Sequence, residues 1–169
     1  HFCFGTPLPF LKEYQLNRLI VFVNPGVDPY GAGYNILQSK IALGSGKLFG
    51  KGLFGGTQNQ LNFLPEKHTD FIFSVIGEEF GFIGVLVVLT IYFFLFWNMI
   101  KTALKARDDF GRLVVTGILA LFFFHVLQNV GMTMGIMPIT GIPLPFISYG
   151  GSAMVTNLLA VGLVININV

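Results

Sequence analysis

The chain has 169 residues, of which 53% are hydrophobic and only 11% are charged. Soluble domains carry about 25% charged residues, so this composition and a mean hydropathy of +0.72 predict a membrane protein. The net charge of +2 is small and the basic residues are scattered, which argues against a nucleic-acid partner. Cys3 is the only cysteine, which excludes an internal disulfide and any zinc site built from cysteines.

Both ends of the chain lie in apolar sequence. The chain starts at His1, and residues 1–10 resemble the tail of an apolar segment without the charged region of a signal peptide. The last stretch, LLAVGLVININV, lacks the lysines and arginines that usually anchor a membrane helix. We therefore expect an internal or carboxy-terminal piece of a longer membrane protein.

Residues 11–79 are expected to form a long loop outside the membrane with short helices of its own. Apolar patterns predict helices at Leu16–Val23 and at residues 34–43. The glycine-rich stretch GSGKLFGKGLFGG (44–56) is not a phosphate-binding P-loop, because Ser45 stands where that motif requires glycine. Two interpretations stay open for it: a plain surface loop, or a basic surface that attracts an anionic headgroup or pyrophosphate through Lys40, Lys47 and Lys51.

The rest of the chain predicts three transmembrane helices. Residues 80–100 are uncharged and long enough to cross a bilayer, and residues 113–169 lack Asp, Glu, Lys and Arg altogether. This second run is too long for one crossing and is expected to break at its proline-rich turn, residues 138–146. We therefore expect helices at 80–100, 113–137 and 147–169.

The orientation follows from the short loop at 101–112, which carries Lys101, Lys105, Arg107 and Arg112. Short loops rich in lysine and arginine stay in the cytoplasm. The loop 11–79 and the turn 138–146 are then expected on the outer side.

Ionisable residues crowd the start of the first membrane helix in PEKHTDFIFSVIGEEF (65–80). Thr69 or Asp70 would suit the N-cap of that helix. Alternatively, Asp70 would serve as a general base, strengthened by partial desolvation beside phenylalanines, or would join His68 as a metal ligand. Glu78 and Glu79 lie deeper, where ionisable groups are functional candidates, but only one of them would share a face with Asp70.

Polar residues also mark the second and third membrane helices. His125, Gln128 and Asn129 share one helix face, either as hydrogen-bonding glue near a Gly131-x-x-x-Gly135 packing motif or as a cavity lining. In GIPLPFISYGGSAM (141–154), the prolines predict irregular backbone, and Ser148 and Ser152 offer small polar groups. Such backbone persists at membrane depth only inside protein or beside a watery cavity, so we expect a site on the side of Asp70.

Two stretches, FLPEKHTDFIFSVIGEEFGFIG and GIPLPFISYGGSAM, resemble the signature sequences of the SEDS family (shape, elongation, division and sporulation). The resemblance runs from Leu11 to Asn168, and YNILQSKIALGSGKLFGKGLFGGTQNQLNFLPE is similar to the rod-shape branch more than to the division branch. It implies an all-α membrane protein of the bacterial cytoplasmic membrane with ten helices. This chain would supply the last three helices and the large loop before them, and we do not expect this piece alone to be active.

The resemblance also implies a chemistry. Family members polymerise lipid II into glycan strands, release undecaprenyl pyrophosphate and work with a class B penicillin-binding protein. The essential carboxylate of the family falls on Asp70, acting as general base or as ligand of a divalent cation. The cations expected near the pyrophosphate are Arg18, Lys40, Lys47 and Lys51. The remaining candidates for substrate binding are His68, Glu79, Ser148 and Ser152. The rival hypotheses are a flippase for the same lipid, a division- or sporulation-type member of the same family, and a scaffold that docks a single-span partner.

Overall fold

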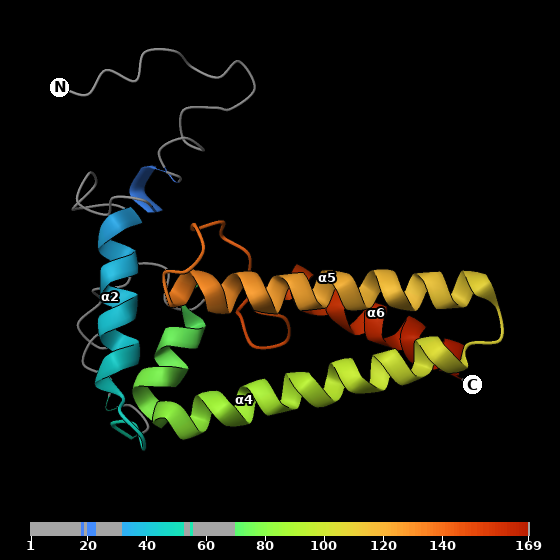
Figure 1. Ribbon diagram of the computed structural model, residues 1–169, viewed down its shortest axis with the longest axis horizontal. Helices are drawn as coiled ribbons and strands as arrows, with labels where there is room; N and C mark the ends of the chain where they lie inside the picture. Colours follow the sequence, from blue (N-terminus) through green and yellow to red (C-terminus); the bar gives the residue numbers. More distant parts are fainter. Residues whose placement is uncertain (1–17, 19, 23–31, 53–54, 56–69, 169) are drawn as a thin grey trace, which may run out of the picture.

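The computed structural model describes residues 18, 20–22, 32–52, 55 and 70–168. Within these ranges the chain forms helices and no strand, as the sequence predicts. The helices are α2 (Ala32–Ser45), α4 (Ile72–Lys105), α5 (Asp109–Thr133) and α6 (Gly151–Asn168). Helices α4, α5 and α6 run along one another, and α2 crosses one end of this bundle (Figure 1). The short helix predicted at 34–43 is therefore confirmed, and residues 18 and 20–22 of the earlier one are helical.

Helices α4 and α5 are each long and apolar enough to cross a membrane. Only 17% and 22% of their most apolar stretches are buried in the described structure, so most of these side chains point outward. Such surfaces are stable against lipid or against further membrane helices. Helix α6 is also apolar but shorter.

The buried side chains form two clusters stacked along the bundle. The first joins α4 and α5 to the proline-rich turn through Phe73, Val85, Tyr92, Val126 and Leu144. The second lies toward the loop between α4 and α5 and includes α6, through Met99, Ala103, Val115, Phe122 and Val164. Near the first cluster, the buried Ser39 hydroxyl hydrogen-bonds the Ser74 hydroxyl (2.6 Å) and donates to the Thr133 carbonyl (2.9 Å), which ties α2 to both long helices.

Helix α4 is longer than the membrane span predicted at 80–100, because it begins at Ile72 and ends at Lys105. It is also kinked at Gly81, whose φ of 67° and ψ of −161° are not helical. A left-handed φ is accessible to glycine at little cost. In Figure 1 the short first segment of α4 and its long second segment meet at this bend, beside the end of α2.

Helix α5 ends at Thr133, before the predicted limit of 137, and Gly135 explains why. The Gly135 N–H donates to the Met132 carbonyl (3.0 Å) and the Ile136 N–H to the Gly131 carbonyl (2.8 Å). With a φ of +68° at Gly135, this is a Schellman motif, which closes a helix at a left-handed glycine. Gly135 thus lies outside the helix, and its prediction as half of a helix-packing motif is wrong.

The proline-rich turn extends beyond its predicted limit of 146, because α6 begins at Gly151 rather than at residue 147. The Leu144 N–H donates to the Ser148 hydroxyl (2.7 Å), and the Ser148 N–H donates to the Leu144 carbonyl (3.0 Å). Phe146 adopts a φ of +66°. This local bonding satisfies polar backbone groups that the missing helical turn would otherwise have paired.

Candidate functional site

Asp70 lies two residues before the first residue of α4 and is partly buried. The N-cap position of the helix belongs to Phe71, whose side chain offers no acceptor and makes no capping bond. The Ser74 N–H instead bonds the Phe71 carbonyl (3.0 Å). The N-cap of α4 is therefore Phe71, and the predicted N-cap role of Asp70 is wrong.

The main chain at Asp70 is fixed to the proline-rich turn by Asn129 of α5. The fully buried Asn129 donates from Nδ2 to the Asp70 carbonyl (3.0 Å) and to the Ile142 carbonyl (2.9 Å). A methyl group at Gly141 would lie 3.4 Å from Oδ2 of Asp70. The Asp70 carboxylate therefore lies over Gly141, so the two signature stretches meet at one place.

Two of the predicted cationic residues contact the same segment of chain. The Arg18 guanidinium donates to the Ile139 carbonyl (3.2 Å). The Lys40 side chain lies over Gly135, where a methyl group would come within 2.4 Å of its Nζ. Residues 135–141 thus carry Lys40 near one end, Arg18 near the middle and Asp70 near the other end.

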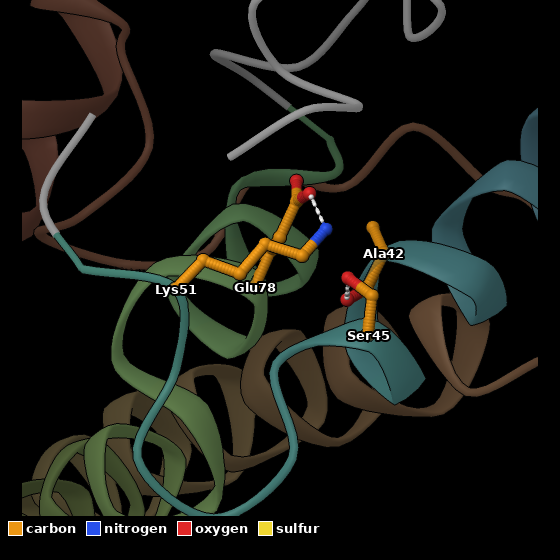
Figure 2. Close-up of polar contacts among 4 residues, drawn as sticks. All are labelled: Ala42, Ser45, Lys51 and Glu78. Atoms are coloured by element: carbon orange, nitrogen blue, oxygen red, sulfur yellow. Dashed lines mark hydrogen bonds and ion pairs between the residues drawn. The ribbon is translucent and has the colours of Figure 1, made fainter. Parts of the chain in front are cut away.

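The other two predicted cations lie elsewhere, at the kink of α4. The Lys51 ammonium forms an ion pair with Glu78 at 2.9 Å, and the Glu78 side chain is only 1% exposed (Figure 2). Lys47 is exposed in the same loop, with a φ of +49°. Glu79 is half-buried beside this loop, and its carbonyl accepts from the Gly52 N–H (3.0 Å). The predicted cationic residues therefore fall into two groups, one that contacts residues 135–141 and one at the kink of α4.

A cavity of about 290 Å³ lies between α5, the proline-rich turn and α6, and its lining includes His125, Ser148, Ser152 and Asn157. Ser148 also stabilises the turn, as described above, whereas Ser152 is exposed. His125 therefore lines a cavity, whereas Gln128 and Asn129 on the same helix face hold neighbouring backbone. His68 lies outside the described residues.

Gln128 and Asn129 act as hydrogen-bonding glue, but not between helices as the sequence predicted. Gln128 donates to the Pro138 carbonyl (2.9 Å), and Asn129 donates to the two carbonyls named above. All three bonds hold irregular backbone rather than another helix. The spacing of these polar residues on one helix face indicated that they were candidates for a role. It did not indicate that Asn129 holds the main chain at Asp70.

In the part of the chain that the structure describes, no three His, Cys, Asp or Glu side chains gather as a ligand set for a metal ion. Structural metal sites usually present three or four protein ligands, whereas Mg²⁺ is often held by one or two carboxylates together with substrate phosphates. A single carboxylate such as Asp70 would need substrate phosphates to complete a site of that second kind. A divalent cation at Asp70 stays a prediction.

Known proteins similar to this one match it along nearly its whole length. The family model for FtsW, RodA and SpoVE, described as cell cycle protein, matches residues 6–169. Peptidoglycan glycosyltransferase RodA of Treponema pallidum is 51% identical over 94% of this chain and 36% of its own length. Peptidoglycan glycosyltransferase MrdB of Escherichia coli K12 is 47% identical over 94% of this chain and 43% of its own length.

Solved structures show the same relationship. A chain of a peptidoglycan synthase complex, reported for its coordination of polymerization and crosslinking, is 32% identical with a TM-score of 0.72, over 95% of this chain and 43% of that chain. The rod-shape-determining protein RodA of Thermus thermophilus is 30% identical with a TM-score of 0.59, over 97% of this chain and 58% of that chain. This chain thus spans less than half the length of its curated relatives named above. With one family model covering nearly all of its length, the chain belongs to the FtsW/RodA/SpoVE family of cell cycle proteins.

Proposed function

We propose that the whole protein is a peptidoglycan glycosyltransferase that polymerises lipid II during cell elongation. The curated relatives with 51% and 47% identity carry that enzyme name, and the first is named RodA, as is the rod-shape-determining protein of Thermus thermophilus. The observation that carries the proposal is the position of the Asp70 carboxylate over Gly141, where the two signature stretches meet. A carboxylate placed at the end of a membrane helix is within reach of a substrate whose lipid tail stays in the bilayer.

The chemistry proposed for Asp70 is general-base catalysis. Asp70 takes the proton from the acceptor sugar 4-hydroxyl, whose oxygen attacks the anomeric carbon of the donor. The bond from that carbon to the pyrophosphate oxygen breaks, and its electron pair leaves with the undecaprenyl pyrophosphate. Attack opposite the leaving group converts the α linkage into a β linkage, as in other inverting glycosyl reactions.

The leaving pyrophosphate requires positive charge as it departs. Arg18 and Lys40 are the cations that support this role, because both contact residues 135–141 beside Asp70. Lys51 pairs with Glu78 at the kink of α4 and Lys47 lies in the same loop, so we propose them as less direct contributors. A divalent cation between Asp70 and the pyrophosphate would supply further charge, with Asp70 as its ligand.

The proposed orientation places Asp70, the loop 11–79 and the turn 138–146 outside the cytoplasm. The support is the short connection between α4 and α5, which carries Lys101, Lys105, Arg107 and Arg112 and is therefore expected inside. The partner proposed is a class B penicillin-binding protein. Its support is the likeness to a chain from a synthase complex in which polymerization and crosslinking are coordinated.

The test uses the full-length protein, purified with its penicillin-binding partner and supplied with labelled lipid II. We expect glycan strands that grow with time and that disappear in Arg18→Ala and Lys40→Ala variants at low substrate. A lipid II scrambling assay in proteoliposomes addresses the rival function, since a flippase moves the lipid without making polymer. Scrambling in the absence of any polymer would replace the polymerase proposal with the transporter.

A further inference from the structure

The kink of α4 is closed by a loop from far earlier in the sequence. In an unbroken helix the Phe82 and Ile83 N–H groups would donate to the Glu78 and Glu79 carbonyls. Here Phe82 and Ile83 donate instead to the carbonyls of Lys47 (2.9 Å) and Leu48 (3.2 Å). The bend at Gly81 therefore transfers its two free donors to the glycine-rich loop.

The two carbonyls released by the kink are satisfied by the same loop. The Lys51 N–H donates to the Glu78 carbonyl and the Gly52 N–H to the Glu79 carbonyl, each at 3.0 Å. We name this arrangement, residues 46–52 bonded to residues 77–83, the kink clasp. The clasp thereby pairs four backbone groups that a broken helix would leave unpaired. Each unpaired group would cost free energy in an apolar membrane environment.

The glycines of the loop are required by this close approach of two backbones. A methyl group at Gly46 would lie 1.9 Å from the Gly77 carbonyl oxygen, and one at Gly50 would lie 2.1 Å from the Glu79 carbonyl oxygen. A methyl group at Gly81 would lie 2.3 Å from the Gly50 nitrogen. The glycine-rich composition therefore serves helix contact, which neither interpretation drawn from the sequence anticipated.

One side-chain pair accompanies these backbone bonds. The Lys51 ammonium lies 2.9 Å from Oε1 of Glu78, and their side chains are 29% and 1% exposed (Figure 2). A carboxylate that is almost fully buried is costly to desolvate, so removing its cationic partner takes away a favourable interaction with that buried charge at the kink. The pair therefore favours the closed clasp over any arrangement in which the loop moves away.

We propose that Lys51 and Glu78 are positioning residues, which hold the first segment of α4 and thereby keep Asp70 aligned for sugar transfer. The inference rests on the proposed function above. The segment from Ile72 to Phe80 has the clasp at one end, and Asp70 lies two residues before its other end. A tilt of this segment at the kink would move Asp70 relative to Gly141, and displacements of about 1 Å cost about 10²-fold in rate.

The test compares the full-length protein and its partner in three forms: Lys51→Met, Glu78→Gln, and the exchanged pair Lys51→Glu with Glu78→Lys. Each single variant is expected to lower kcat for lipid II polymerisation by about 10²-fold, with KM little changed. The exchanged pair is expected to recover part of the lost rate. Lys105→Gln removes a lysine at the far end of the same helix and is the control, expected to retain wild-type kinetics.

Amide hydrogen exchange provides a readout that does not depend on activity. Peptides covering residues 47–52 and 79–83 are expected to exchange faster in both single variants and to regain protection in the exchanged pair. Lys51→Arg keeps the charge and is expected to remain near wild type in rate and in exchange, which separates loss of the pair from general misfolding.

The same measurements define the results that would overturn the positioning proposal. If Lys51→Met raises KM while Glu78→Gln keeps wild-type rate and exchange, then Lys51 binds the pyrophosphate and the positioning proposal is overturned. Wild-type kinetics in both single variants would overturn it as well. If the wild-type protein makes no polymer, the proposed function fails, while faster exchange in the single variants still reports that the clasp depends on the ion pair.

Discussion

The buried amide of Asn129 joins the carbonyl of Asp70 to the carbonyl of Ile142 through hydrogen bonds of 3.0 and 2.9 Å. One side chain of α5 thereby sets the distance between the start of α4 and the proline-rich turn. Both carbonyls belong to irregular backbone, which lacks the repeating backbone hydrogen bonds of a helix or a sheet. The geometry around the Asp70 carboxylate therefore depends on a residue that need not touch the substrate.

Replacing Asn129 with alanine is expected to lower both stability and activity. Two carbonyls lose a donor, and each buried polar group left unpaired costs about 1–3 kcal/mol. Thermal unfolding of the full-length protein in detergent measures the first effect, and the rate of lipid II polymerisation measures the second. Asn98→Ala is the matched control, because Asn98 is an exposed asparagine on α4. Equal behaviour of the two variants would contradict the role given to Asn129.

Side chains at Gly141 are expected to be tolerated in order of their size. The φ of +71° at this position disfavours any L-residue by about 1–2 kcal/mol. A methyl group would only touch Asp70, at 3.4 Å from Oδ2, so Gly141→Ala should retain measurable polymerisation. Gly141→Val should lose much more activity, because its larger side chain displaces the carboxylate. Similar rates for the two variants would show that the carboxylate does not lie over Gly141 in the working enzyme.

Substitutions at two glycines of the loop 46–52 distinguish the effect of backbone strain from the effect of contact with α4. Gly50 and Gly52 both have a left-handed φ, of +75° and +88°. A methyl group at Gly50 would collide with the backbone of α4, whereas one at Gly52 would meet nothing within 4 Å. Gly50→Ala is therefore expected to lower the melting temperature far more than Gly52→Ala, which carries only the strain of about 1–2 kcal/mol. Comparable losses from the two substitutions would argue against the kink clasp.

The buried hydroxyl pair formed by Ser39 and Ser74 is expected to show strong coupling. Each serine replaced by alanine leaves its partner without the 2.6 Å bond, at a cost of about 1–3 kcal/mol. The double variant removes both polar groups and should be less destabilised than the sum of the single variants. A double-mutant cycle on thermal unfolding measures this difference, and strict additivity would show that the two hydroxyls do not interact.

Features that depend on composition and local sequence were predictable here. The uncharged runs predicted the helices α4 and α5, because apolar length is what a membrane demands. Asp70 was a candidate because it is a carboxylate just before such an uncharged run, and the resemblance to the SEDS family implied its role. Proline chemistry located the break between α5 and α6.

Features that depend on backbone conformation and distant contacts were not predictable from one sequence. Gly81 and Gly135 looked like ordinary glycines of apolar helices, yet both adopt a left-handed φ that a residue letter does not reveal. The N-cap of α4 went to Phe71 instead of Asp70, because tertiary contacts decided where the helix begins. The pairing of Lys51 with Glu78 joins residues on separate elements, so no spacing rule indicated it.

The role proposed for the Asp70 carboxylate in sugar transfer is tested by Asp70→Asn, because asparagine keeps the shape of the side chain and removes its charge. In a lipid II polymerisation assay with the full-length protein and its partner, we expect the rate to fall by about 10²–10⁴-fold, the contribution typical of a general base. Thermal unfolding and retention of the partner should stay at the wild-type level. Glycan strands formed by Asp70→Asn at the wild-type rate would contradict the account.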